Sequence, residues 1–127
     1  MKKEADIWMK LAEEDYKDME IMVERNRYRG AVLFAQQAVE KILKAYIVEF
    51  GSDAPKKIHR LERLIKDTDL DLSELGHPPV HELSIAYEWA RYADLSRSHF
   101  QSKRDVEKLL VMAKQLFVWV RKKFKNR

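Results

Sequence analysis

The stretch that decides the fold runs from Tyr28 to Gly51 and reads YRGAVLFAQQAVEKILKAYIVEFG. Its apolar residues recur at steps of three and four, the period of an α-helix with one broad apolar face. They are Ala31, Val32, Ala35, Ala38, Val39, Ile42, Leu43, Tyr46, Ile47 and Phe50. The opposite face carries Gln37, Glu40, Lys41 and Lys44. We therefore predict one helix of about 22 residues, roughly 33 Å long, which ends at Gly51 and is too charged to span a membrane.

Further helical patterns lie on both sides of this stretch. The predicted helices cover Lys3–Glu24, Lys56–Lys66, Pro79–Ala93, and a last segment from Ser102 to about Lys123. The first connection is only three residues long, so the first two helices should pack as an antiparallel hairpin. No strand alternation or repeat is visible. We expect an all-α fold, an antiparallel up-and-down bundle of four long helices plus one short helix, with residues 1–127 forming a single domain.

Two longer connections join the later helices. Residues 67–79 contain turn formers and three leucines, and we expect these leucines to lie over one end of the bundle. They are Leu70, Leu72 and Leu75. Residues 94–101 are polar and are predicted to form a loop. Ser102 and Asp105 then have the spacing of a capping box, which predicts the start of the last helix.

Composition narrows the class of protein. The chain has 127 residues and no cysteine, which excludes a disulfide framework, a thiol nucleophile and a thiolate metal site. The sequence begins directly with an amphipathic helix and has no apolar signal segment, so we expect a cytoplasmic protein. The formal net charge is +4, and much of the excess lies in residues 121–127. This basic end is either a solvated helix terminus or a phosphate contact.

Two predicted helices carry apolar residues on a second side. These residues are Ile85, Trp89, Val111, Met112, Val118 and Trp119. A helix that is apolar on more than one side usually buries the second side as well, and in a small bundle another copy of the chain could cover it. We therefore predict a homodimer. The alternative is that these are ordinary exposed apolar residues, which are common.

The segment Gln36–Ala45, with the sequence QQAVEKILKA, resembles the signature helix of the HEPN domain family (higher eukaryotes and prokaryotes nucleotide-binding). Three other segments agree with this family in the same order along the chain. They are Trp8 with residues 12–15, His59-Arg60-Leu61 with Leu64, and Arg91-Tyr92-Ala93-Asp94. The resemblance implies a helical domain that binds a nucleotide or RNA. For a short prokaryotic member it also implies a partner of a separately encoded minimal nucleotidyltransferase, often in a toxin–antitoxin pair, and it implies no cofactor.

Arg91 is the most informative single residue for function. A guanidinium at the edge of a buried helix stripe needs a partner, which would be a carboxylate, from Asp94 or a glutamate, a carbonyl, or a phosphate. Catalytic HEPN proteins share a motif of an Arg, four to six intervening residues and a His. In these proteins the motifs of two subunits come together to cleave RNA. Here seven residues separate Arg91 from His99, and His99 is expected in the loop. The chain departs from the motif, so catalysis stays open, with a metal-independent dimeric RNA endonuclease through Arg91 and His99 as the alternative.

The predicted nucleotide- or phosphate-binding residues are Gln37, Lys41, Lys44, His59, Arg91 and Asp94. Gln37, Lys41 and Lys44 form a polar strip on the central helix. The alternative is that this strip is the ordinary exposed face of a surface helix, stabilised by a Glu40–Lys44 pair. In the resemblance, His59 corresponds to a recurrent histidine of the family; its alternative role is a cap or a buried hydrogen bond. A protein-interaction module without nucleotide binding is the second alternative function.

His77 and His81 are four residues apart, which is a metal-ligand spacing on a helix. Pro78 and Pro79 lie between them and begin the helix, so the two histidines do not share a helical face. We therefore predict no metal site.

Overall fold

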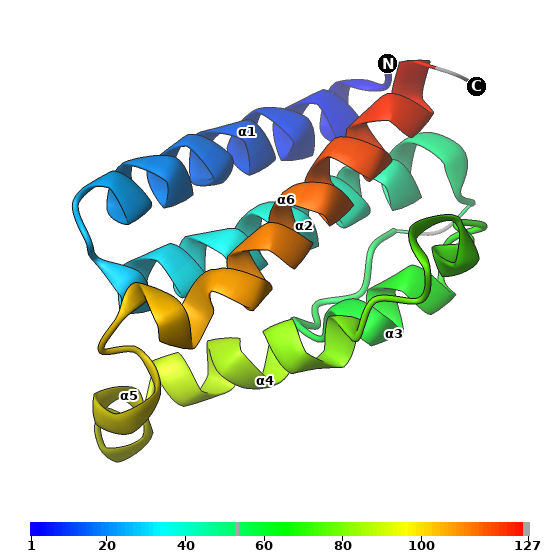
Figure 1. The fold of residues 1–127 in the computed structure, drawn as a ribbon. Coiled ribbons are helices and arrows are strands. Elements are labelled where there is room, and N and C mark those ends of the chain that lie inside the picture. The colour runs from blue at the N-terminus through cyan, green and yellow to red at the C-terminus, as the bar shows by residue number, and fades with distance from the viewer. Residues whose placement is uncertain (53, 126–127) are drawn as a thin grey trace.

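The computed structural model describes residues 1–52 and 54–125, with only the backbone described at residues 96 and 97. The helices are α1 (Lys3–Glu24), α2 (Tyr28–Phe50), α3 (Leu61–Lys66), α4 (Val80–Ala90), α5 (Ala93–His99) and α6 (Lys103–Lys125), with a 3-10 helix, η1, at Leu72–Leu75. The described residues contain no strand, so the predicted all-α class is confirmed, and α1, α2, α4 and α6 are its long helices (Figure 1). None of the described helices is long and apolar enough to cross a membrane.

Helix α2 is the centre of the bundle. It packs against α1, α6, α4 and α3, and it runs behind α6 in Figure 1. Its apolar stripe, from Ala31 to Ile47, is buried as predicted. Its polar side is buried as well in the middle of the helix, because α1 and the chain before α3 approach it there, and this burial creates the site described below.

The turn between α1 and α2 confirms the predicted antiparallel hairpin. Asn26 has a left-handed backbone (φ 58°), which asparagine tolerates better than most residues. The amide of Arg27 donates to the carbonyl of Met22 at 2.8 Å and closes the turn. Figure 1 shows the beginning of α1 and the end of α6 at the same end of the bundle.

The prediction for the helix after Pro55 was wrong at its start, since α3 begins at Leu61 instead of Lys56. Hydrogen bonds from other helices explain the difference. The side chain of Gln36 on α2 donates to the carbonyl of His59, and the amide of Leu61 donates to Ser84 Oγ on α4 at 2.9 Å. These groups are therefore paired across the fold instead of within a longer helix.

The predicted loop at residues 94–101 was also wrong, because Ala93–His99 forms the helix α5. Helix α4 ends at Ala90, three residues earlier than predicted, and Arg29 Nη1 on α2 donates to the Ala90 carbonyl at 3.0 Å. His99 therefore lies at the end of a helix and not in a loop. Asp105 Oδ2 accepts from the amide of Ser102 at 3.0 Å, which forms the acidic half of the predicted capping box before α6.

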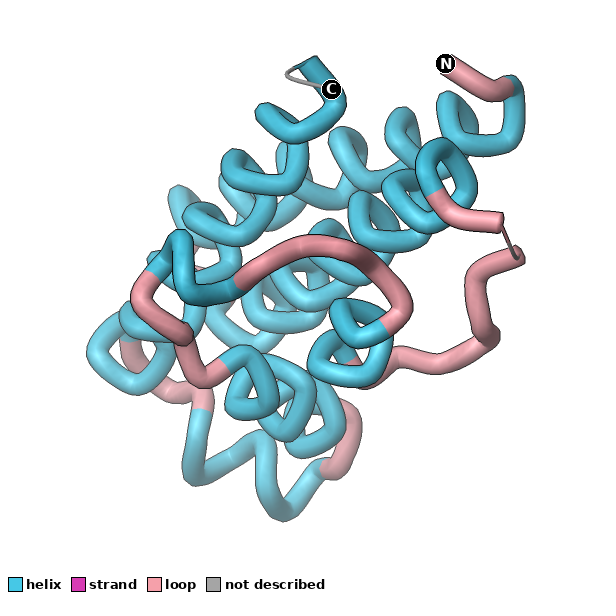
Figure 2. The backbone as a smooth tube through the Cα atoms, turned by 90° about the vertical axis from the view of Figure 1, so that its right-hand side faces the viewer, coloured by secondary structure: helices cyan, strands magenta, loops and turns pink. Residues whose placement is uncertain are grey.

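The segment between α3 and α4 lies over one end of the bundle as predicted, and its leucines pack against the core. They are Leu70, Leu72 and Leu75. In Figure 2 the loop from α3 to η1 faces the viewer across this end. The same segment helps to cover α6: Trp119 shares a cavity wall with Leu70, and Met112 shares one with Pro79. Two of the apolar residues on which the homodimer prediction rests are thus buried within one chain, while Trp89 and Val111 stay exposed.

Candidate functional site

Three side chains meet at the last turn of α4. Arg91 is the C-terminal capping residue of this helix, and its guanidinium carbon lies 5.3 Å from the ring centroid of Tyr87, one turn earlier. The ring of His59, from the segment before α3, has its centroid 5.8 Å from the same Tyr87 ring. The structure therefore brings two of the predicted phosphate-binding residues, His59 and Arg91, to one aromatic ring.

His59 is held in place from the central helix α2. Its Nδ1 lies 3.0 Å from Oε1 of Glu40, and its carbonyl accepts from Nε2 of Gln36 at 2.5 Å. Both ends of the residue are thus fixed, while 60% of the side-chain surface remains exposed. A histidine whose ring is open to solvent but whose position is fixed from the core is suited to contact a ligand.

Glu40 lies at the centre of a buried polar cluster. Its Oε2 accepts from Lys44 Nζ at 2.9 Å, and its Oε1 also accepts from Gln36 Nε2 at 3.3 Å. Glu40 is 5% exposed, Lys44 6% and Gln36 0%. The Lys44 ammonium lies 5.3 Å from the ring centroid of Trp8 on α1. The Glu40–Lys44 pair was expected on the surface, but it is part of the interior.

The predicted polar strip on α2 is therefore not an open anion-binding surface. Lys44 is bound to Glu40, and Lys41 Nζ is bound to Oδ2 of Asp15 on α1. A phosphate would have to displace a carboxylate of the same chain from each lysine. Gln37 is half-buried, and its part in nucleotide binding stays a prediction.

Arg91 has no ion pair with Asp94 or with a glutamate in the described part of the chain. Asp94 is exposed in the first turn of α5. The ring of His99 contacts that of Trp89 in a tilted arrangement with centroids 4.4 Å apart, and its Nδ1 lies 2.9 Å from the carbonyl of Leu95. Trp89 is two residues from Arg91, which is roughly 200° around the helix. Within one chain, His99 and Arg91 thus lie on different sides of α4.

Two more arginines flank the end of α4. Arg29 donates to the Ala90 carbonyl, directly before Arg91 in the chain. Arg60 Nη2 is paired with Glu88 Oε1 at 2.9 Å. The carbonyl end of a helix dipole favours such cations. Because Arg29 binds a neutral carbonyl in this contact, its charge is not neutralised there and adds to that of Arg91.

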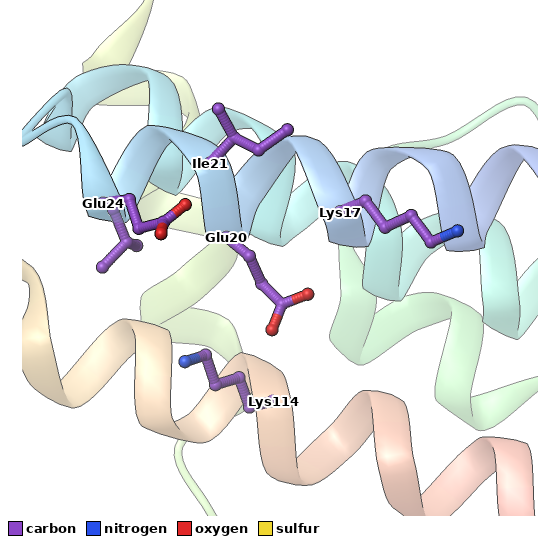
Figure 3. Close-up of a pocket in the computed structure, with 6 residues that line it drawn as sticks. Lys17, Glu20, Ile21, Glu24 and Lys114 are labelled. Atoms are coloured by element: carbon purple, nitrogen blue, oxygen red, sulfur yellow. The ribbon is translucent and has the colours of Figure 1, made fainter.

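The groove between α1 and α6 is a different kind of feature. Its volume is about 560 Å³, and its lining residues are Lys17, Glu20, Ile21, Val23, Glu24 and Lys114. Figure 3 shows Lys114 of α6 facing the side of α1 that carries Glu20 and Glu24. Charges of both signs line it, and none of the predicted site residues does. It offers no preference for an anionic ligand.

Sequence reasoning found His59 and Arg91 but missed Gln36, Glu40 and Tyr87 as parts of the site. One signal was available for Gln36, which lies in line with Val32 and Val39 at helical spacing. A polar residue in the middle of an apolar stripe must find a buried partner. No such signal marked Glu40, because the segment that covers it is distant in the sequence.

The comparisons with known proteins agree with this architecture. The family model described as HEPN domain matches residues 5–123, which is almost the whole chain. No curated protein and no solved structure showed significant similarity. The match includes the central helix α2, the His59 segment and the end of α4. The chain belongs to the HEPN domain family.

Proposed function

We propose that this HEPN domain binds a nucleotide or RNA through a phosphate contact at Arg91 and His59. The observation that carries the proposal is the exposed guanidinium of Arg91, which rests against Tyr87 and has no carboxylate partner in the described part of the chain. A guanidinium is planar and has five N–H donors, so a ring on one face leaves its edge open to a phosphate. Charge-assisted bonds of this kind are among the stronger hydrogen bonds in proteins.

His59 supplies the second contact in this proposal. Its Nδ1 faces Glu40, so Nε2 is the nitrogen on the exposed edge of the ring. As an imidazolium, the ring donates through Nδ1 to Glu40 and through Nε2 to a phosphate oxygen near Arg91. Arg29 adds positive charge next to Arg91 and attracts the anion electrostatically.

The biological setting of the proposal is a two-protein system. The family resemblance supports a domain that works as partner of a separately encoded minimal nucleotidyltransferase, as one component of a toxin–antitoxin pair. The sequence lacks the Gly-Ser and paired carboxylates of such a transferase, so this chain would be its helper or its target. Co-expression with a separately encoded minimal nucleotidyltransferase from the same genome, followed by co-purification, tests this part separately from nucleotide binding.

A protein contact is favoured by a groove on the other side of α4. The groove has a volume of about 430 Å³, and its apolar lining residues are Ile85, Ala86, Trp89, Phe100 and Leu109. Trp89 and Val111 are large exposed hydrophobic residues on or beside this face. We place the proposed homodimer contact here. The polar site at Arg91 lies around the helix from it and would remain open in such a dimer.

The test is the affinity for a fluorescently labelled single-stranded oligoribonucleotide, measured by anisotropy. Arg91→Ala should weaken binding by about tenfold to a hundredfold, the loss of one charge-assisted contact. Arg121→Ala is the matched control, because its guanidinium carbon also lies 5.3 Å from an aromatic ring one turn earlier, that of Phe117. The control should retain affinity within about twofold. Equal losses in both variants would show that only net charge matters and would refute the site.

The same RNA decides between binding and cleavage. Intact RNA after incubation with the wild-type protein supports a binding domain. Cleavage that persists with a chelator and is lost in both Arg91→Ala and His99→Ala would establish the endonuclease instead. That result would require a second subunit to supply one of the two side chains, because a single chain keeps them on different sides of α4.

A further inference from the structure

We infer that Glu40 and Gln36 are positioning residues for His59, and that they fix its ring in one orientation and one tautomer. When the ring is neutral, Nδ1 carries the proton and donates to Glu40. Nε2, on the exposed edge of the ring, is then the nitrogen that must take up a second proton to donate to a phosphate. The inference deepens the proposed function and rests on it, because it assigns to His59 a phosphate contact that requires this orientation.

The first argument is the burial of these polar groups. Gln36 and Glu40 lie one turn apart on the central helix and are 0% and 5% exposed. Burying polar and charged groups is unfavourable unless all are paired, and apolar residues of similar size often give an equally stable interior. Within the described residues Gln36 Oε1 has no hydrogen-bond partner, so the cluster is not optimised for stability. Both side chains nevertheless reach the same residue, His59.

The second argument comes from the individual atoms of the cluster. Glu40 Oε2 binds the Lys44 ammonium, which compensates the carboxylate charge. Glu40 Oε1 is left for His59 Nδ1 at 3.0 Å and for Gln36 Nε2 at 3.3 Å. An ionised carboxylate only accepts hydrogen bonds, so Nδ1 must be the protonated nitrogen of the neutral ring. Gln36 fixes the backbone through the His59 carbonyl and prevents the ring from swinging away from Tyr87.

The histidine tautomer can be measured directly in the free protein by nitrogen-15 NMR of the imidazole rings. At a pH at which the rings are neutral, His59 should show a protonated Nδ1, whereas the exposed rings of His77 and His81 should show the Nε2-protonated form that free histidine prefers. His59→Gln identifies the signal. An Nε2-protonated ring at His59, like the rings of His77 and His81, or a mixture of both tautomers would overturn the inference.

A double variant tests the role of the carboxylate in binding. Glu40→Leu combined with Lys44→Met removes the ion pair as a unit and leaves neither charge unpaired, so the bundle should fold with a melting temperature close to that of the wild type. His59 should then lose its Nδ1-protonated form, and affinity for the oligoribonucleotide should fall about tenfold, as in His59→Gln. A folded double variant with unchanged affinity would refute the positioning role.

The two proposals fail in different ways. If the wild-type protein binds no oligoribonucleotide, the proposed function is wrong, and the NMR measurement still decides whether Glu40 fixes the ring. If the wild type binds and Arg91→Ala does not, but the double variant binds normally, the function stands and the positioning inference is wrong.

Discussion

Lys44 and Lys10 occupy the same kind of position, four residues after an acidic partner on a helix, but in different surroundings. Lys44 Nζ is 2.9 Å from Glu40 in the interior, and Lys10 Nζ is 3.0 Å from Asp6 on the surface of α1. Lys44→Met should lower the free energy of unfolding by about 3–5 kcal/mol, because it leaves Glu40 buried without its cation.

Lys10→Met is the matched control for this prediction. An exposed pair contributes little, so the change should stay below about 1 kcal/mol. Urea denaturation of both variants measures the difference. Similar small losses would mean that the Glu40 cluster is hydrated and not part of the interior.

At the scale of single residues, the sequence was informative where chemistry is local. Arg91 and His59 could be singled out because of their residue types and their places in a recognisable motif. Glu40 could not, because its surroundings are determined by residues 54–60, which fold back onto α2. The helical wheel of α2 alone gives Glu40 and Lys44 a solvent face, and only tertiary packing buries them.

Among the elements, α1 and α6 are joined by the stacked rings of Tyr16 and Phe117, whose centroids are 4.4 Å apart. Burial, together with Glu20, raises the pKa of Tyr16 above its ordinary value of 10.0, while Arg121 opposes the shift. The unfolded chain therefore loses this proton at a lower pH than the folded chain does. Stability should fall as the pH rises from about 10 through the raised pKa.

Tyr16→Phe should reduce the loss of stability at high pH. Urea denaturation at about pH 9 and about pH 11 measures this difference. The exposed Tyr92 provides the control, and Tyr92→Phe should keep the pH dependence of the wild type. If both variants keep that dependence, the contact between α1 and α6 does not retain the tyrosine proton.

Gly30 inside α2 and Gly51 at its C-terminal cap should respond differently to an added methyl group. A Cβ at Gly51 would lie 2.5 Å from the carbonyl oxygen of Ile47. Gly51→Ala should therefore lower the free energy of unfolding by about 1–2 kcal/mol. A Cβ at Gly30 would meet only the flexible side chain of Met22, with its sulfur at 3.0 Å. Gly30→Ala should be neutral or slightly stabilising, since alanine favours a helix interior. Thermal unfolding of both variants shows which one is less stable. A larger drop in melting temperature for Gly30→Ala than for Gly51→Ala would contradict this prediction.

The bounds of the two longest N-terminal helices, α1 and α2, were predictable from the sequence, whereas those of α3, α4 and α5 were not fully predictable. The spacing of apolar residues predicted both ends of α1 correctly and those of α2 to within one residue. In these helices the residues with helical spacing are also the residues that pack in the core. The bounds of α3, α4 and α5 depend on hydrogen bonds from other parts of the chain, such as Ser84 to Leu61 and Arg29 to Ala90. Local sequence patterns contain no information about these partners.

For the whole molecule, the proposed homodimer gives a direct prediction. Trp89→Glu places a charge in the apolar groove beside α4 and should shift the protein to a monomer. Ile21→Glu is the control, because Ile21 is also an exposed large apolar residue but lies on α1 at the other groove. Light scattering after size-exclusion chromatography measures the mass. A wild-type monomer, or dissociation by both substitutions, would contradict the placement of this contact.

The central claim is that a phosphate group binds between His59 and Arg91. The most direct measurement is an NMR titration of the labelled protein with a short oligoribonucleotide, which follows backbone amides and arginine side chains together. The account predicts that the largest shifts occur at residues 59–60 and 87–91 and at the Arg29 side chain. Shifts confined to the basic end of α6 or to the groove between α1 and α6 would contradict it.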